Sequence, residues 1–598
     1  MKRVTLPLLA LSTTIASALA GTLIAPGGAA AATDPFTTTT LHFKVLVGPG
    51  GDQVCDVVGD VYVPQGASSG QPVPAVLTTN GFGGSKDDQA AAAGALATRG
   101  YAVLSYSGLG FGGSGCRITL DDPDFDGRAA SQLVSYLGGA GGIAFLDAGH
   151  TQPAPVQTAI RLDGPNDPRV GTFGGSYGGG FQFAVASIDP RVDALVPLIT
   201  WNDLSYSLDP NNTAQTTGVS TDVPGAAKLM WAAGFSVEGV TADLQNQQVP
   251  PDLVPCPNFA DFVCPALISA AATGYLSPAD VAQLRRRSVA SFVPRIKAPT
   301  LLIQGERDTL FNLNEAVATY RALQQQGTET KMIWQLGGHS GAAAPGEVDW
   351  ADPASGYISG RVLAWFERYL KGRPSVGTGP EFAYFRDWTS YTGNAAPAYG
   401  TAASYPVGAP RTWRLSGAGD LVTGTTPAAG GAQSFLTPAA GLPTRLDEMD
   451  VFGSVLGPVV SLVDDLPGTF ATWTTPALTA PLRVVGSPSV RLQVSAPTAA
   501  VSQLLGPAGE LVLFVKVADV APDGTARLIN GLEAPVRIPD VTRPFTVQLP
   551  GIVHEFAPGH RLRLVVSGGS INYRGGVLAT PVTIASGAGQ TLTLPVVP

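Results

Sequence analysis

Strand-like runs alternate with helical stretches from about residue 40 to residue 375, and this alternation constrains the fold more than any other feature of the chain. The strand-like runs are 73–81, 101–108, 169–175, 194–201, 298–305 and 331–339. Strands that alternate with helices predict a parallel sheet covered on both faces. Residues 202 to about 290 interrupt the alternation without any strand rhythm, so we expect an inserted helical lid there.

The texture of the sequence changes after Lys371. A linker-like "RPSVGTGP" is followed, from about residue 380 to residue 598, by short strands between Gly, Pro and Asp turns, almost without helical periodicity. This pattern predicts a second, all-β domain, a sandwich or jelly roll. We therefore predict an α/β domain over 33–375 and an all-β domain over 380–598. A chain of 598 residues, 44% of them hydrophobic, can bury the cores of two or more domains.

The first residues have the pattern of a secretory signal peptide. Lys2 and Arg3 precede an apolar stretch, and four alanines end at Ala32 before a polar start. This predicts a signal peptide over 1–32 and a secreted, extracellular protein. A retained membrane anchor is the alternative, which the Thr, Ser and Gly residues in the stretch disfavour. Since no later segment is apolar and long enough to span a bilayer, no membrane association is expected after cleavage.

The chain has four cysteines, and an exported protein can keep disulfides. Three pairings are possible. Cys256 and Cys264 share one Pro-rich stretch, "VPCPNFADFVCP", and are expected to close a small loop. Cys55 with Cys116 would then follow by elimination. The CxxC spacing and nearby His of a metal site are missing, so no metal is expected.

The overall charge disfavours nucleic acid as a partner. Lys and Arg number 36 against 45 Asp and Glu, and the only basic run, Arg285 to Arg287, is interpreted as a solvated helix end. "GLGFGG" at Gly108–Gly113 fits the dinucleotide fingerprint G-x-G-x-x-G. No helix opens on its last glycine, however, and Asp121 and Asp122 come too early for the ribose carboxylate. We expect neither a nucleotide nor any other cofactor.

The stretch "GTFGGSYGGG" at 171–180 has six glycines around one serine, after a short strand and before the helical "FQFAVASI". A nucleophile at such a strand-to-helix turn has a strained backbone, and Gly174 and Gly178 remove side chains that would collide there. The helix N-terminus then directs free N–H groups toward the serine oxygen. G-x-S-x-G alone is weak in a glycine-rich chain, and "GASSG" at 66–70 matches it in a surface loop. The context predicts Ser176 as the nucleophile.

A base must accept the proton of that serine, and enzymes with this elbow place the acid and then the histidine after the serine in the chain. His339, on a Gly-rich loop at the end of a strand-like run, fits that order and is predicted to be the base. The other four of the five histidines do not fit: His42 and His150 precede the serine, and His554 and His560, in the all-β domain, are expected to be ordinary surface or turn residues.

The strand-end "LLIQGERD" supplies the acid. Asp308, 31 residues before His339, is predicted to accept a hydrogen bond from it and fix its tautomer, with Glu306 as the runner-up. The oxyanion hole needs two donors. We predict the backbone N–H of Tyr177 and that of Phe82, in the loop "NGFGGSK" at 80–86, with Gly81 or Gly83 as the next choice for the second donor.

The motifs "GGSYGG", "GERD" and "GGHSG", followed by the all-β domain, resemble the Xaa-Pro dipeptidyl-peptidase / cocaine esterase (CocE/NonD) family. "SGLGFGGSG", "ITWND" and "GHRLRLVVSGGSINY" are also similar to that family. The resemblance implies an α/β-hydrolase fold with a helical lid and a C-terminal jelly roll. It also implies Ser176 as nucleophile, Asp308 as acid and His339 as base.

Two features depart from the family pattern. Members often have a tyrosine hydroxyl on the first oxyanion loop, where this chain has Phe82, and the family's Arg is missing from "SGLGFGG", where Gly108 or Leu109 stands. In members that cleave dipeptides, a carboxylate of the lid region binds the free amino terminus. Asp203 and Glu238 are the candidates here, but a solvated surface role is expected for either.

Taken together, the sequence predicts a secreted serine hydrolase that cleaves an ester or peptide acyl bond through an acyl-enzyme on Ser176. Its partner would be a small-molecule or peptide substrate, and we expect an ester to react faster than a Xaa-Pro peptide. The alternative is an exported binding protein with an inactive hydrolase fold, which the complete Ser–Asp–His set argues against. The oligomeric state does not follow from the sequence.

Overall fold

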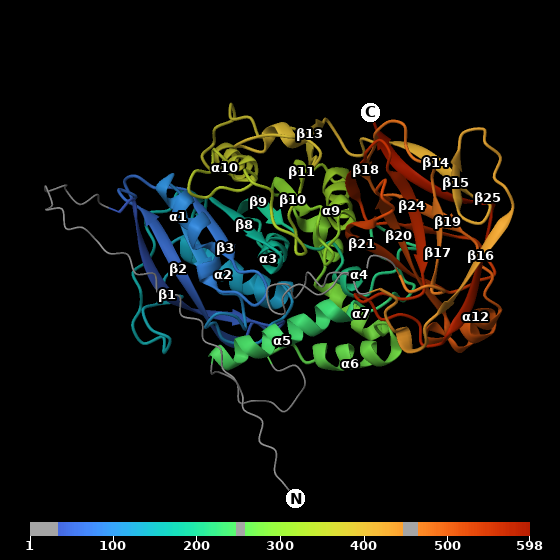
Figure 1. The fold of residues 1–598 in the computed structure, drawn as a ribbon. Helices are drawn as coiled ribbons and strands as arrows, with labels where there is room; N and C mark the ends of the chain where they lie inside the picture. The colour runs from blue at the N-terminus through green and yellow to red at the C-terminus, as the bar shows by residue number, and fades with distance from the viewer. Residues whose placement is uncertain (1–33, 247–257, 446–464) are drawn as a thin grey trace, which may run out of the picture.

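The computed structural model describes residues 34–246, 258–445 and 465–598, and the predicted signal peptide lies outside them. These residues form two large β-sheets, one in an α/β domain and one in an all-β domain (Figure 1). In the described part of the chain, no helix has the length and apolar character needed to cross a membrane.

The first sheet has eleven strands in the order β13-β12-β11-β10-β9-β8-β3-β4-β2-β1-β5. Seven neighbouring strands are parallel, which confirms the predicted parallel sheet. They are β4 (Ala102–Tyr106), β3 (Ala75–Thr79), β8 (Val170–Gly175), β9 (Val192–Leu198), β10 (Thr300–Gly305), β11 (Thr330–Gln335) and β12 (Phe382–Phe385). The carboxyl ends of parallel strands meet at one edge of a sheet, so the loops after β3, β8, β10 and β11 converge there.

The flanks of this sheet were not predicted. β1 (Phe36–Val47) and β2 (Gln53–Pro64) form a long antiparallel hairpin, and β5 (Ala144–Phe145) pairs with β1. At the other edge, β12 pairs with β11, and β13 (Tyr399–Ala402) pairs with β12. The α/β domain therefore extends beyond the predicted boundary at 375–380. The reason is that a short strand after a linker has the same local pattern whichever sheet it joins.

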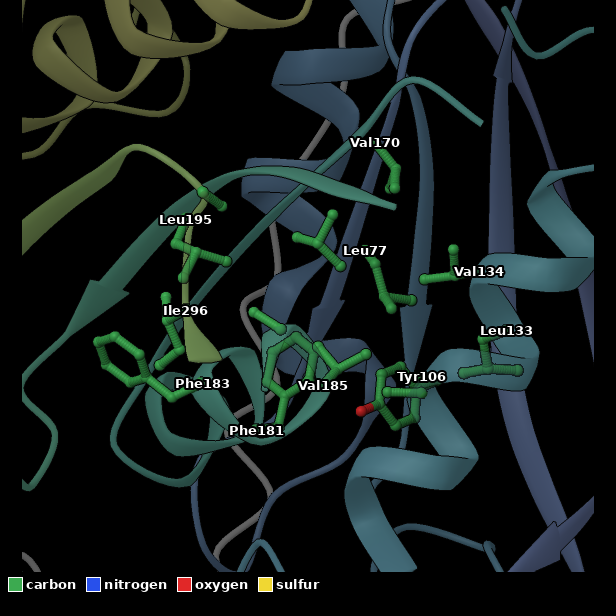
Figure 2. Close-up of a cluster of buried hydrophobic side chains, with 14 of the residues drawn as sticks. Leu77, Tyr106, Leu133, Val134, Val170, Phe181, Phe183, Val185, Leu195 and Ile296 are labelled. Atoms are coloured by element: carbon green, nitrogen blue, oxygen red, sulfur yellow. The ribbon is translucent and has the colours of Figure 1, made fainter. Parts of the chain in front are cut away.

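Helices cover both faces of the first sheet. On one face lie α2 (Arg128–Leu137), α3 (Tyr177–Ala186) and α9 (Leu313–Gln325), and on the other lie α1 (Ala90–Thr98) and α10 (Tyr357–Tyr369). Alternate residues of a strand point to opposite faces, so Leu77 of β3 packs in the first of these cores and its neighbour Val76 in the second. Figure 2 shows α3 within the first core, where Phe181 lies among side chains of the strands.

The predicted lid region, between β9 and β10, is helical. It contains α4 (Leu204–Leu208), α5 (Leu229–Asn246), α6 (Val263–Thr273), α7 (Pro278–Arg286) and α8 (Val289–Phe292). Figure 1 shows α5, α6 and α7 in green beside one another. Ser277 caps α7 through a capping box with Asp280 and is followed by Pro278, the arrangement that favours a helix start.

The basic run at the end of α7 is not simply solvated, which corrects the sequence interpretation. Arg287 is buried and forms an ion pair of 3.0 Å with the buried Asp122, while Arg286 lies 2.7 Å from Asp124. The loop before α2 supplies these carboxylates, so the arginines join the lid to the α/β domain. This pairing could not be predicted from the sequence, since the two segments are more than 160 residues apart.

The second sheet forms the all-β domain, and its path runs β21-β20-β24-β17-β15-β14-β25-β18-β23. Trp413 and Trp473 lie in its apolar core. Its strands are β14 (Ala409–Ser416), β15 (Asp420–Thr423), β16 (Gly431–Thr437), β17 (Phe470–Thr474), β18 (Leu482–Gly486), β19 (Ser489–Leu492), β20 (Leu511–Val520), β21 (Ala526–Ile538), β22 (Phe545–Gln548), β23 (Ile552–Phe556), β24 (Arg561–Ser567) and β25 (Thr580–Val597). In the described residues of this domain, helical content is limited to short turns such as α12 (Pro497–Ser502). The predicted all-β fold of this part is confirmed.

A disulfide joins Cys55 of β2 to Cys116 in the loop after β4, as predicted. The two cysteines are 61 positions apart in the sequence. Cys256 lies outside the described residues, so its pairing with Cys264 stays a prediction.

Candidate active site

Ser176 lies at the sharp turn between β8 and α3. Its backbone has φ 58° and ψ −119°, a conformation that L-residues rarely adopt and that costs on the order of 1–3 kcal/mol. The turn projects the serine side chain from the carboxyl edge of the sheet. Such strain persists only where the surrounding structure fixes it.

The glycines around Ser176 allow this turn, as the sequence predicted. A Cβ on Gly174 would collide with the carbonyl oxygen of Gly178, and a Cβ on Gly178 would lie 2.6 Å from that of Thr79. Gly179 and Gly180 are equally crowded, against Thr200 and Trp201. The helix can therefore start directly under β3 and β9 only because these positions have no side chain.

The structure brings together the three residues predicted as nucleophile, base and acid. His339 Nε2 lies 2.8 Å from Ser176 Oγ, and His339 Nδ1 lies 2.7 Å from Asp308 Oδ2. The Asp308 carboxylate can only accept, so Nδ1–H donates to it and Nε2 is left to accept the serine proton. This is the relay that a serine nucleophile requires.

Asp308 is fully buried and held by its own loop. Its Oδ1 accepts the backbone N–H groups of Leu310 at 3.0 Å and Phe311 at 2.7 Å. These bonds orient Oδ2 toward His339. The runner-up Glu306 lies elsewhere: its Oε1 accepts the N–H of Phe385 in β12 at 3.1 Å. Burial raises the pKa of the Glu306 carboxyl well above its usual value.

Aromatic rings enclose the imidazole of His339. The ring of Phe311 lies edge-on to it at a centroid distance of 5.1 Å, and that of Trp231, on α5, at 5.8 Å. Thr309, on the acid loop, connects this loop to the histidine loop and to α5. Its Oγ1 lies 2.6 Å from Ser340 Oγ and accepts the Trp231 Nε1–H at 3.2 Å. Sequence reasoning missed Trp231, which carries no motif and reaches the site only through the fold of the lid.

The loop predicted to complete the oxyanion hole lies beside the nucleophile. A Cβ on Gly81 would be 3.9 Å from the Ser176 Cβ. The ring of Phe82 packs against Phe235 at 4.8 Å and Phe111 at 5.1 Å. Position 82 therefore contributes an apolar ring to this part of the site and no hydroxyl. The donor roles of the Phe82 and Tyr177 N–H groups stay predictions.

A small apolar pocket of about 90 Å³ opens at Ser176. Apart from Ser176 and Ser236, every residue that lines it is aromatic or aliphatic. The aromatic ones are Phe82, Tyr177, Trp201, Phe235, Phe259 and Phe311, and the aliphatic ones are Leu120, Leu204, Leu208, Ala232, Val263 and Leu267. A larger cleft of about 700 Å³, between α9 and the all-β domain, contains none of the predicted site residues.

The two candidate lid carboxylates, Asp203 and Glu238, have different surroundings. Asp203 is buried and caps α4, where its Oδ1 accepts from both the hydroxyl and the N–H of Ser205. This corrects the expected solvated role for Asp203. Glu238 remains exposed on α5, with its Oε2 against Gly83 of the oxyanion loop.

The remaining histidines lie in two similar clusters, each around one aspartate. Asp56 lies 2.8 Å from both His42 and His150. His554 and His560 lie 3.1 Å and 2.9 Å from Asp519. The sequence predicts ordinary surface or turn residues at His554 and His560. In the structure they connect β20, which carries Asp519, to β23 and to the loop before β24. Across the described ranges, no group of His, Cys, Asp and Glu has the arrangement of a metal site.

Two family models match consecutive parts of the chain. The model of X-Pro dipeptidyl-peptidase (S15 family) matches residues 54–341, and that of the X-Pro dipeptidyl-peptidase C-terminal non-catalytic domain matches residues 401–581. No curated protein sequence matches the chain significantly.

Several solved structures are similar over nearly the whole chain. An aminopeptidase from a marine sediment Thaumarchaeota archaeon is 14% identical with a TM-score of 0.62, and an alpha-amino acid ester hydrolase is 15% identical with a TM-score of 0.61; each comparison covers 96% of this chain and 98% of the other. A CocE/NonD family hydrolase from Staphylococcus aureus is 13% identical, with a TM-score of 0.57 over 94% of this chain and 97% of its own. At these identities the similarity shows a shared fold.

The parallel sheet, the lid and the matched catalytic-domain model define a serine hydrolase with the α/β-hydrolase fold. With both of its domains matched in this order, the chain belongs to the X-Pro dipeptidyl-peptidase (S15) family of these hydrolases.

Proposed function

We propose that this chain is a secreted esterase that transfers short, uncharged acyl groups through an acyl-enzyme on Ser176. The observation that carries the proposal is the position of Ser176 Oγ, 2.8 Å from His339 Nε2 and at the mouth of an almost wholly apolar pocket. The contact with His339 gives Ser176 a base. The apolar pocket selects the substrates that Ser176 can attack.

The proposed reaction has two halves. His339 Nε2 accepts the Ser176 proton as Oγ attacks the ester carbonyl, and the oxyanion that forms faces the N–H groups of Tyr177 and Phe82. The imidazolium, stabilised by Asp308, returns the proton to the departing alkoxide. Water then attacks the acyl-enzyme while His339 accepts its proton. The carboxylic acid product leaves as His339 returns that proton to Ser176 Oγ.

The pocket favours an uncharged acyl group. No carboxylate is among the residues that line the pocket, so an ammonium placed among Phe82, Phe235 and Phe259 would lose its hydration at a cost of several kcal/mol. Glu238 is exposed, lies against Gly83 of the oxyanion loop and does not line the pocket. An apolar acyl chain, in contrast, gains about 0.8 kcal/mol per buried methylene.

Two matched substrates test this preference. The nitrophenyl ester of butyric acid and that of 2-aminobutyric acid differ only in the ammonium, and we expect kcat/KM to be at least about tenfold higher for the butyrate. A Xaa-Pro-anilide should be slower still. Ser176→Ala should abolish all three rates, with wild-type thermal unfolding as the control for folding. Equal rates for the two esters would contradict the acyl preference, and activity in Ser176→Ala would contradict the nucleophile.

Secretion is supported by the signal-like N-terminal sequence and by the Cys55–Cys116 disulfide, since disulfides persist in oxidising compartments. Expression in a secreting bacterial host tests it. We expect protein in the culture medium whose N-terminal sequence begins near Thr33. Retention of the intact chain in the cytoplasm would contradict export.

A further inference from the structure

A buried lysine outside the predicted site lies directly behind the loop that carries the acid. Lys228 immediately precedes lid helix α5, and its side chain is 3% exposed. Its Nζ donates to the backbone carbonyl of Thr309 at 2.9 Å and to that of Leu310 at 2.6 Å. Both carbonyls belong to the two residues after Asp308.

These bonds complete the restraint on the acid loop. Within the loop, Asp308 Oδ1 accepts the N–H groups of Leu310 and Phe311. From the lid, the ammonium of Lys228 donates to the carbonyls of Thr309 and Leu310. Charge-assisted hydrogen bonds of this kind are about twice as strong as neutral ones. The orientation of Asp308 toward His339 therefore depends on a cation that touches neither residue.

The all-β domain forms the remaining wall around Lys228. The ammonium lies 5.6 Å from the ring centroid of the buried Tyr573, within the range of a cation–π contact. The neighbouring Arg574 donates its backbone N–H to the carbonyl of Ala227 at 2.8 Å. The all-β domain thus packs against Ala227 and Lys228, and Lys228 anchors the acid loop.

The charge of Lys228 depends on groups from three segments. Burial lowers the pKa of Lys228 to about 8, and carboxylates around it oppose that shift. These carboxylates are Asp308 on the acid loop, Glu315 on α9 and Glu533 on β21, and Tyr573 faces the ammonium from the all-β domain. Among the described residues, no carboxylate lies within ion-pair distance of Lys228, so the two carbonyls are its main acceptors.

We propose that Lys228 is a positioning residue of this hydrolase: its ammonium fixes the loop that presents Asp308 to His339, and so couples the all-β domain to the catalytic acid. The inference rests on the proposed roles of Ser176, His339 and Asp308. It also gives the second domain a part in catalysis without contact to the substrate.

The test compares Lys228→Met, Lys228→Arg and wild type on nitrophenyl butyrate. Lys228→Met keeps most of the buried volume and removes the charge, and Lys44→Met, on an exposed site of β1, is the matched control. We expect Lys228→Met to lower kcat about 10- to 100-fold with KM within about twofold, because a displaced acid misaligns His339 without changing the acyl pocket. Lys228→Arg should restore part of kcat, and Lys44→Met should match wild type.

The pH profile separates positioning from a purely structural role. A lysine whose pKa is lowered to about 8 loses its proton as the pH rises through that value, so wild-type kcat should fall between pH 7.5 and 9.5. Lys228→Arg keeps its charge and should show no such fall. This comparison also holds if Lys228→Met does not fold.

A folded Lys228→Met variant with wild-type kcat would overturn the inference, and so would identical alkaline profiles for wild type and Lys228→Arg. Ser176→Ala is assayed in parallel. If it is inactive while Lys228→Met is unimpaired, only the role of Lys228 fails. If Ser176→Ala retains activity, the proposed catalytic mechanism fails.

Discussion

The indole of Trp231 lies edge-on against the imidazole of His339, with ring centroids 5.8 Å apart. Trp231 belongs to the lid and His339 to the loop after β11, so the lid contacts the proposed base directly. The same indole donates to Thr309 Oγ1 on the acid loop. The lid thus forms part of the site as well as its cover.

Trp231→Phe should lower kcat about fivefold, because it keeps the aromatic contact with His339 and loses one hydrogen bond of about 1 kcal/mol. Trp231→Ala should lower kcat further and reduce the free energy of unfolding by about 3–5 kcal/mol, since it empties a buried aromatic site. Steady-state kinetics and urea unfolding measure the two effects. If Trp231→Phe is as inactive as Trp231→Ala, the hydrogen bond matters more than we infer.

The identity of the acid is tested by two isosteric changes. Asp308→Asn should lower kcat by about 10³- to 10⁴-fold, because the amide would favour the wrong tautomer of His339. Glu306→Gln should leave kcat within about twofold, since burial raises the pKa of Glu306 well above its usual value and Gln mimics the protonated acid. The opposite ranking of the two variants would assign the acid to Glu306.

The glycine requirement at the elbow is tested by Gly178→Ala. The new Cβ would lie 2.6 Å from the carbonyl oxygen of Thr79, so β3 or α3 must shift. We expect loss of at least about 100-fold in kcat and a destabilisation of about 1–3 kcal/mol. Gly70→Ala, in the other G-x-S-x-G match, is the control, because its Cβ would meet only Ser68 Oγ at 3.9 Å. Equal activity of the two variants would show that the elbow tolerates a side chain.

The cluster around Asp519 should stabilise the all-β domain in a pH-dependent way. Burial alone would raise the pKa of Asp519, but hydrogen bonds from His554 and His560 outweigh it and lower that pKa. A lowered folded-state pKa gives stability above the unfolded value of about 3.9 and loses it as the pH falls below that value. Asp519→Asn should therefore lower Tm at pH 7, by an amount that shrinks toward pH 3. A constant difference across that range would exclude this carboxylate as the cause.

Much of the site could be predicted because motif and topology act together. The elbow around Ser176, and the positions of Asp308 and His339 after strand ends, follow from local pattern once a parallel sheet is assumed, since that sheet gathers its carboxyl-end loops. The sequence favours Asp308 over the runner-up Glu306, and the structure shows that Asp308 faces His339 while Glu306 contacts β12. Both follow the same strand, and two residues of backbone decide which carboxyl faces the histidine.

The parts that could not be predicted depend on contacts between distant segments. β12 has the local pattern of the strands that follow it, yet its partner is β11 in the first sheet. Lys228 and Trp231 carry no motif and reach the acid loop because the lid packs against a loop about 80 residues further along the chain. The pairing of Arg287 with Asp122 depends on the same packing.

Labelling with a fluorophosphonate, followed by mass spectrometry of the peptides, tests the central claim most directly. The reagent modifies a serine only where a base activates its oxygen and an oxyanion site receives the phosphoryl oxygen. We predict one adduct per chain, on Ser176, which forms in the wild type and is lost in His339→Ala. An unlabelled wild type, or an adduct on another residue, would contradict the assignment of this protein as a Ser176 hydrolase.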